Sequence, residues 1–189
     1  MDYETKPTSR KTLRRLSVYF RELFDVQATG AFPVLEALEK FPGIFKGSTI
    51  QIVEDERLPP CIMAQCTPNE KGGFDLEIKE SVYDGAYRNG NGACLGFICH
   101  EMCHAFLYKI GYTPILARSF NDREIPPYRS VEWQAKALCG EVMIPYGESR
   151  WMDQQQIIDT YHVSKAFAKV RRKLAAKEEI SDTRKKHHM

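Results

Sequence analysis

The run HEMCH contains two histidines and a glutamate at a spacing that could support metal-dependent catalysis. His100 and His104 are four residues apart, so on a helix their imidazoles would point from one face toward a common point. Such a pair supplies two ligands of a tetrahedral zinc ion. Glu101 lies beside them and would act as general base toward a water that the metal makes more acidic. The motif therefore predicts zinc-dependent hydrolysis of peptide bonds.

An apolar helix is expected around the motif, at residues 92–108. This stretch contains no proline, follows the Gly-rich run 89–92, and closes at Lys109 and Gly111. Five-residue HExxH matches also arise by chance on protein surfaces. The apolar setting favours a buried metal-binding helix over such an accident.

A catalytic zinc needs a third protein ligand, and no histidine lies between His104 and His162. The candidates are therefore the carboxylates of Asp122, Glu124, Glu132 and Glu141. Glu132 is preferred because it begins an expected helix, residues 130–145, which can lie antiparallel to the metal helix and hold its side chain rigidly. The alternative interpretation is an acidic residue that only favours the dipole of its own helix.

A further donor would be needed to stabilise the oxyanion of a peptide-cleavage reaction. Tyr83, Tyr128, Tyr146 and His162 are the candidates, and the sequence does not choose among them. Packing in the core is the alternative role for each tyrosine.

The rest of the chain predicts an α+β fold, a zincin-like domain with a small antiparallel three-stranded sheet packed on the HExxH helix and helices at the C-terminus. Hydrophobic periodicity predicts helices at residues 10–24, 31–41, 152–161 and 163–177, and strands at residues 48–53, 61–66 and 74–79. The three strands are expected to form a meander. If strand 74–79 lies at the sheet edge, an extended substrate can pair with it.

The predicted organisation is one metallopeptidase domain at residues 1–150, a helical segment packed on it at residues 151–178, and a basic flexible tail at residues 179–189. The polar loop 114–127 is a candidate substrate lid, with a plain surface loop as the alternative.

Composition narrows the protein class. The 189 residues are 43% hydrophobic and 28% charged, values typical of a globular protein, and no apolar run is long enough to span a bilayer. The N-terminal residues lack the apolar segment of a signal peptide, so a cytoplasmic location is expected. The 6 cysteines are predicted to be reduced and buried, with disulfides or additional metal ligands as alternatives.

Both ends of the chain are basic. Residues 1–21 hold 6 Lys and Arg against 2 Asp and Glu, and residues 165–189 hold 9 against 3. These ends are interpreted as solvated segments, with contact to nucleic acid or to an acidic partner as the alternative.

Three blocks of this sequence resemble the ImmA/IrrE family of zinc metallo-endopeptidases. Residues 78–107 carry VYDGA and the HExxH helix, and residues 132–145 (EWQAKALCGEVMIP) are similar to a family helix whose leading glutamate is the third metal ligand. Residues 157–174 are similar to the closing helices with their V-S and R-L signature. The chain departs from the pattern at Cys103, where the family usually has glycine, and at Lys136, where it often has asparagine.

The resemblance implies a gluzincin-like site in which His100, His104 and Glu132 hold Zn²⁺ and Glu101 is catalytic. It also implies a protein substrate, a helix-turn-helix transcriptional repressor or a similar regulator. Two alternatives stay open: a non-catalytic regulatory module that binds a repressor or DNA, and a protease of the SprT-like kind that acts on DNA-bound protein. Proteases of the SprT-like kind have a third histidine downstream, in an H-G-x-x-F context, and this chain lacks it.

Overall fold

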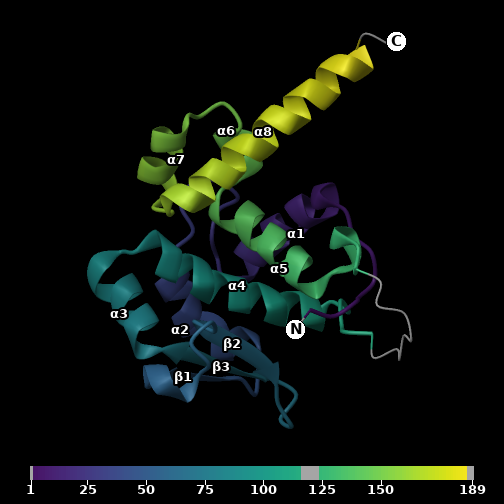
Figure 1. Ribbon diagram of the computed structural model, residues 1–189. Helices are drawn as coiled ribbons and strands as arrows, with labels where there is room; N and C mark the ends of the chain where they lie inside the picture. The colour runs from purple at the N-terminus through teal and green to yellow at the C-terminus, as the bar shows by residue number, and fades with distance from the viewer. Residues whose placement is uncertain (1, 116–123, 187–189) are drawn as a thin grey trace.

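A computed structural model describes residues 2–115 and 124–186 of the chain. The described residues form an α+β fold of eight α-helices and one three-stranded mixed sheet (Figure 1). The α+β class predicted from the sequence is therefore confirmed. Among the described residues, no helix combines the length and the apolar character needed to cross a bilayer.

The bounds of the elements, in chain order, are α1 (Arg10–Leu23), α2 (Val34–Ile44), β1 (Thr49–Val53), the 3-10 turn η1 (Asp55–Arg57), β2 (Ala64–Pro68), β3 (Phe74–Lys79), α3 (Glu80–Asn89), α4 (Gly92–Lys109), the 3-10 turn η2 (Pro127–Arg129), α5 (Val131–Met143), α6 (Tyr146–Ser149), α7 (Gln154–Tyr161) and α8 (Lys165–Lys186).

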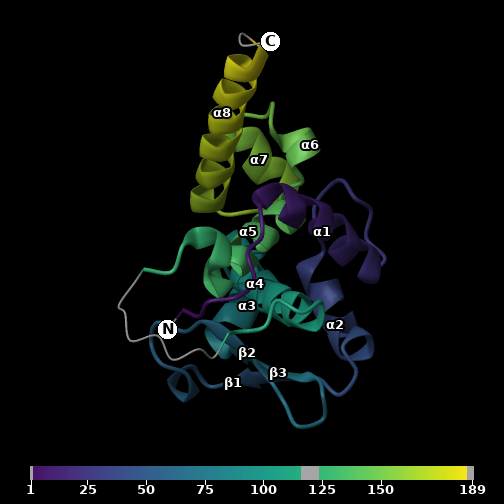
Figure 2. The same ribbon diagram turned by 90° about the vertical axis from the view of Figure 1, so that its right-hand side faces the viewer.

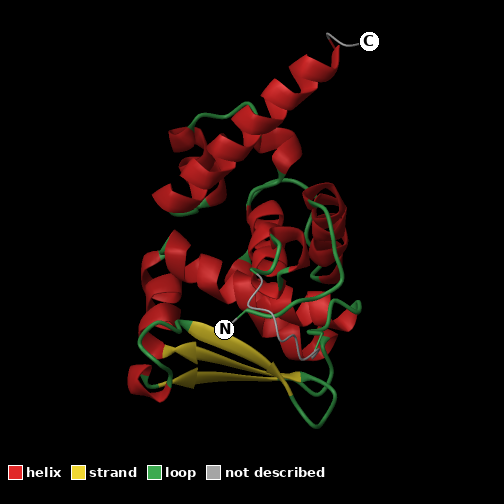
Figure 3. Cartoon of the chain, turned by 45° about the vertical axis from the view of Figure 1, so that its right-hand side comes forward, coloured by secondary structure: helices red, strands yellow, loops and turns green. Residues whose placement is uncertain are grey.

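The helix α4 is the centre of the molecule. The sheet lies on one side of it and α5 on the other, with α1 packed against α5 (Figures 1 and 3). The face of α4 that meets these elements is fully buried, as Ile98, Met102 and Ala105 illustrate. A chain of aromatic rings continues the core through α1 and α2, and Phe20 meets Phe106 of α4 edge to face at 5.4 Å. A buried α4 is what the apolar run predicted.

The sheet differs from the predicted antiparallel meander. Its order is β1-β3-β2, in which β1 pairs parallel with β3 and β2 pairs antiparallel with β3. The reason is a close backbone approach at the start of β1 and β3: a Cβ on Gly73 would lie 2.3 Å from the carbonyl carbon of Gly47. Because both strands start at this contact, they run in the same direction. Thr49 and Asp75 lock it with a 2.8 Å hydrogen bond.

The central position of β3 also corrects the expected substrate-pairing strand. Both edges of β3 are occupied, so residues 74–79 cannot accept another strand. The edge strand that contacts α4 is β2.

The C-terminal part consists of α7 and α8, and α8 projects away from the rest of the fold (Figures 1 and 2). Two segments are more helical than predicted. Residues 80–89, which lie outside the predicted helices and strands, form a complete helix, and α8 continues past the expected end near residue 177 to Lys186, through most of the expected tail. The central residues of the proposed lid lie outside the described part of the chain.

Candidate metal centre

Two local features fix the start of α4. The side chain of Asn91 caps the helix by accepting hydrogen bonds from the backbone N–H groups of Ala93 and Cys94, at 2.9 and 3.3 Å. Gly92 allows the turn before α8 to approach, since a Cβ there would lie 2.5 Å from the carbonyl carbon of Val163. Because the first turn of α4 is fixed by these contacts, the positions of His100 and His104 along the helix are fixed as well.

Residues from the N-terminal segment and from η2 fix the start of α5. Ser130 is the N-cap and accepts a 2.8 Å hydrogen bond from the N–H of Trp133. Asp2 accepts hydrogen bonds from the Ser130 hydroxyl at 2.6 Å and from the Glu132 N–H at 3.1 Å. The carboxylate of Glu132 therefore extends from a helical turn that is held on two sides.

The side chains of His100, His104 and Glu132 converge between α4 and α5. The Nε2 atoms of the two imidazoles are 3.0 Å apart. One carboxylate oxygen of Glu132 lies 3.4 Å from Nε2 of His100, and the other lies 3.4 Å from Nε2 of His104. The rings of the two histidines are nearly perpendicular, at 85°.

These distances suit a tetrahedral metal ion. Bonds of about 2.0 to 2.2 Å from a metal to nitrogen and oxygen ligands place neighbouring ligand atoms about 3.3 to 3.6 Å apart. The distances of 3.0 and 3.4 Å between the three donors lie close to these values. Two neutral imidazoles and one carboxylate are also a donor set that zinc accepts. The residues therefore fit a three-ligand metal site.

Glu101 lies beside the two histidines: the ligand atoms of these three residues are all within 4.8 Å of one another, and Glu101 is partly buried. Burial raises the pKa of its carboxyl, while the charges of His100 and His104 and a hydrogen bond from the backbone N–H of Cys66 act in the opposite direction. That N–H comes from the edge strand β2. A carboxyl whose pKa is raised toward neutrality is suited to accept and return a proton.

Glu132 and His104 affect each other's protonation. Hydrogen bonds from the two histidines lower the pKa of Glu132. Burial acts to lower the pKa of His104, but its hydrogen bond to Glu132 and the charge of Glu101 raise the net value. The site between the helices therefore favours positive charge, and a bound cation would replace the proton on the histidine pair.

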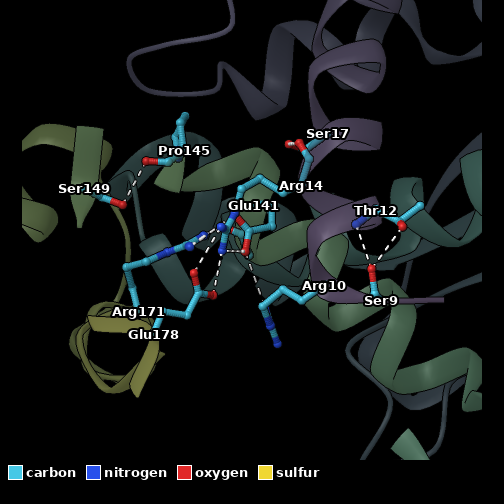
Figure 4. Close-up of polar contacts among 11 residues, drawn as sticks. Ser9, Arg10, Thr12, Arg14, Ser17, Glu141, Pro145, Ser149, Arg171 and Glu178 are labelled. Carbon is cyan, nitrogen blue, oxygen red and sulfur yellow. Dashed lines mark hydrogen bonds and ion pairs between the residues drawn. The ribbon is translucent and has the colours of Figure 1, made fainter. Parts of the chain in front are cut away.

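The other candidates for a third ligand are placed differently. Glu141 is buried at the far end of α5 and forms ion pairs with three arginines (Figure 4), Arg10, Arg14 and Arg171. Glu124 is exposed in the segment before η2. Asp122 lies outside the described residues. Of the three carboxylates that the structure describes, Glu132 is the one that lies against the histidines.

The candidate oxyanion donors are scattered. Tyr146 stacks under the guanidinium of Arg14, at 3.6 Å, in the cluster around Glu141. His162 is exposed in the turn after α7 with φ 53°, beside the start of α4. Tyr128 is 52% exposed in η2, four residues before Glu132, and Tyr83 stacks on Tyr87 in α3. Tyr128 is thus the one nearest in sequence to a proposed ligand, and its role stays a prediction.

All 6 cysteines are free thiols, as predicted, but they divide into two groups. Cys99, Cys103 and Cys139 are buried between α4 and α5, whereas Cys61 is exposed and the remaining two are half-buried. The sequence prediction of burial is therefore right for three of them.

Two contributors to the site were missed in the sequence. Asp2 reaches α5 from a position about 130 residues away, and no local pattern indicates that contact. The N–H of Cys66 requires knowledge of the strand order. Asp2 is one of two acidic residues in a segment rich in Lys and Arg, and this was the one signal for it that the sequence offered.

In comparisons with known proteins, no protein-family model and no curated protein sequence matches the chain.

Proposed function

We propose that the protein is a zinc-dependent endopeptidase whose metal is held by His100, His104 and Glu132 and whose general base is Glu101. The observation that carries this proposal is the convergence of the three donor side chains with Glu101 at the edge strand β2. The resemblance to ImmA/IrrE enzymes favours the same four residues. The third-ligand geometry favours this gluzincin-like arrangement over the SprT-like one, which requires a third histidine.

The chain's own residues divide the work of peptide hydrolysis. The bound zinc would acidify a water and polarise the scissile carbonyl. Glu101 would accept a proton from the attacking water and deliver it to the leaving amine. Glu132 and the two histidines would hold the metal. The hydrogen bond from the backbone N–H of Cys66 stabilises the ionised form of the Glu101 carboxylate.

The edge of β2 provides a way to bind an extended peptide. This strand contacts α4 and is paired on one side with β3, which leaves its other side free of strand partners in the described structure. An extended substrate can pair with such an edge through backbone hydrogen bonds. The protein substrate implied by the resemblance is a transcriptional repressor with a segment that can adopt this extended form.

The decisive test compares two variants of the zinc-loaded full chain. Glu101→Gln should retain one zinc per chain and lose cleavage of a repressor that the parent protein cleaves, because the ligands remain and the base does not. Exposed Glu80→Gln is the matched control and should cleave like the parent. Metal content by mass spectrometry and cleavage products by gel electrophoresis give the two readings. Undiminished cleavage by Glu101→Gln would contradict the proposal.

A second candidate function, a regulatory module that binds DNA, is favoured by the α7–α8 pair. The two helices are joined by three residues, and His162 in this turn adopts the left-handed conformation. Short turns of this kind join the helices of DNA-binding helix-turn-helix motifs. Lys165 and Lys169 are exposed on the first turns of α8, while Ala168 is buried against the fold.

Duplex DNA binding separates this candidate from the peptidase. If the protein is such a module, replacing Lys165 and Lys169 by alanine should weaken binding to duplex DNA and flatten its salt dependence, since each phosphate contact releases a counterion. Exposed Lys46 and Lys71, replaced together, serve as the control with the same change in charge. Fluorescence anisotropy measures both. Equal affinity of the two double variants would exclude α8 as a specific DNA contact.

A further inference from the structure

Three cysteines form a cluster next to the candidate metal centre that the proposed peptidase reaction does not use. Cys99 and Cys103 are four residues apart on α4 and share a face, and Cys139 of α5 lies opposite them. Their sulfur atoms all lie within 4.8 Å of one another. The exposed fractions of these residues are 0%, 0% and 3%.

The helix geometry separates this cluster from the histidine site. Adjacent residues on a helix point about 100° apart, so the sulfurs of Cys99 and Cys103 face away from the imidazoles of the residues that follow each of them. Glu132 and Cys139 are seven residues apart on α5 and meet α4 at different heights. The Sγ atom of Cys139 lies 3.7 Å from the carbonyl oxygen of Gly96, near the beginning of α4. The sulfur cluster is thus a second set of donors beside the first, and Cys139 is close enough to interact electrostatically with His100 and His104.

The spacing suits a three-coordinate ion. Three bonds of about 2.3 Å, the length of a metal–thiolate bond, hold the sulfur atoms about 4 Å apart around a planar centre and about 3.5 Å apart around a pyramidal one such as a trivalent metalloid. The observed upper limit of 4.8 Å between the sulfur atoms is compatible with either separation. Zinc takes four ligands, which makes a dry set of three sulfurs a poor zinc site. Thiolates select soft ions instead.

Charge decides between the soft ions. A buried site penalises any uncompensated charge. Three thiolates around Cu(I) carry a net charge of −2, and the guanidinium of Arg21, which interacts electrostatically with Cys99, offsets one of these charges. Three thiolates around a trivalent metalloid carry no net charge. The apolar surroundings therefore favour the trivalent ion.

We propose that Cys99, Cys103 and Cys139 form an all-sulfur site that binds one trivalent metalloid of the arsenite class. Arsenous acid reacts with the three thiols to give the tris-thiolate and three waters. Three As–O and three S–H bonds break, three As–S and three O–H bonds form, and arsenic stays in the trivalent state. The adduct cross-links α4 to α5, the two helices that carry the candidate metal ligands.

The test uses the reduced full chain and arsenite. A variant in which Cys61, Cys66 and Cys94 are all replaced by alanine retains only the three clustered thiols. It should form a one-to-one adduct in native mass spectrometry, with three As–S bonds in X-ray absorption. No adduct, or an arsenic atom with fewer than three sulfur ligands, overturns the proposal even if other variants fail to fold.

Single replacements complete the test. Cys103→Ala and Cys139→Ala should each lose the three-sulfur adduct, whereas Glu132→Ala should keep it, which distinguishes this site from the proposed zinc site. Retention of the adduct in Cys139→Ala would overturn the site. Equimolar Cu(I) added to the arsenite-loaded protein should leave the arsenic bound, and its displacement would overturn the metalloid assignment.

Discussion

The helix α5 carries a buried glutamate near one end and a half-exposed glutamate at the other, and the two carboxylates have opposite surroundings. The side chain of Glu141 is 0% exposed and forms ion pairs at 3.1 to 3.5 Å with Arg10, Arg14 and Arg171 (Figure 4). The side chain of Glu132 is 49% exposed and faces two imidazoles. The charge of Glu141 is neutralised by arginines, which are always cationic. The charge of Glu132 is neutralised only when the histidines bind a proton or a metal ion.

This difference shows how a glutamate can either stabilise the fold or bind a metal ion, depending on the side chains that surround it. Arginine keeps its charge at all ordinary pH values, so the cluster around Glu141 is satisfied in the folded protein. It joins α1, α5 and α8, because Arg14 also pairs with Glu178 at 2.9 Å. Histidine is neutral or charged near neutrality, so the site at Glu132 can exchange protons for a metal ion. The far end of α5 is therefore expected to set stability and the near end to set metal affinity.

The largest effect on stability is expected for Glu141→Ala. Removing one partner of a buried ion pair leaves buried arginines without compensation, which costs about 3 to 5 kcal/mol of unfolding free energy. Urea denaturation followed by circular dichroism measures this. Glu178→Ala, whose side chain is 34% exposed, is the matched control and should cost about 1 kcal/mol or less. Equal losses in the two variants would contradict the assigned roles.

The reverse result is expected for Glu132→Ala. Loss of a direct ligand should weaken zinc binding at least as much as the 10 to 100-fold that loss of an outer hydrogen-bond partner costs. Stability of the metal-free protein should change little at pH values above the folded pKa of His104, where that imidazole is neutral and the half-exposed carboxylate has lost its charged partner. Competition titration with a zinc chelator measures the affinity, and Glu124→Ala is the exposed control. Stoichiometric zinc of parental affinity in Glu132→Ala would show that another residue is the third ligand.

The two ends of α5 should also differ in their pH dependence. The raised pKa of His104 contributes stability below its ordinary value of 6.5, and this is lost as pH rises through the folded value. The lowered pKa of Glu132 contributes stability above its ordinary value of 4.5, and this is lost as pH falls through the folded value. In the metal-free protein the pair therefore stabilises most between pH 4.5 and 6.5.

Thermal unfolding of the metal-free protein across this pH range tests the interval. Glu132→Gln should flatten the dependence, because the neutral amide supplies no charge to the histidines. Zinc should shift the optimum upward, since metal binding requires neutral imidazoles. An unchanged profile in Glu132→Gln would exclude coupling between these residues.

The sequence predicted those parts of the molecule that depend on local pattern. The spacing of His100 and His104 and the apolar run around them determine where the imidazoles point on α4. The preference for Glu132 depended on one long-range assumption, that α5 runs against α4, and the contacts of Glu132 and Cys139 with α4 satisfy it. The metal and the reaction stay predictions.

The errors arose where long-range contacts decide the structure. Strand order depends on the approach of Gly73 to Gly47, which periodicity does not encode, so the meander was predicted wrongly, and strand 74–79 does not meet the condition of lying at the sheet edge. Glu141 was a candidate ligand because its position on the helix was known and its arginine partners were not. Those arginines come from α1 and α8, at opposite ends of the chain.

The smallest effect is expected for Asp2→Ala, which changes only the support of Glu132. The Asp2 carboxylate accepts hydrogen bonds from the Ser130 hydroxyl and the Glu132 N–H, so its loss removes a cap of α5 worth about 1 kcal/mol. Zinc affinity should fall by about 10-fold, the lower range for an outer partner. Asp2→Asn retains an acceptor and should lose less. If the two variants bind zinc like the parent, Glu132 is positioned by α5 alone, and the N-terminal segment contributes to stability without acting on the metal.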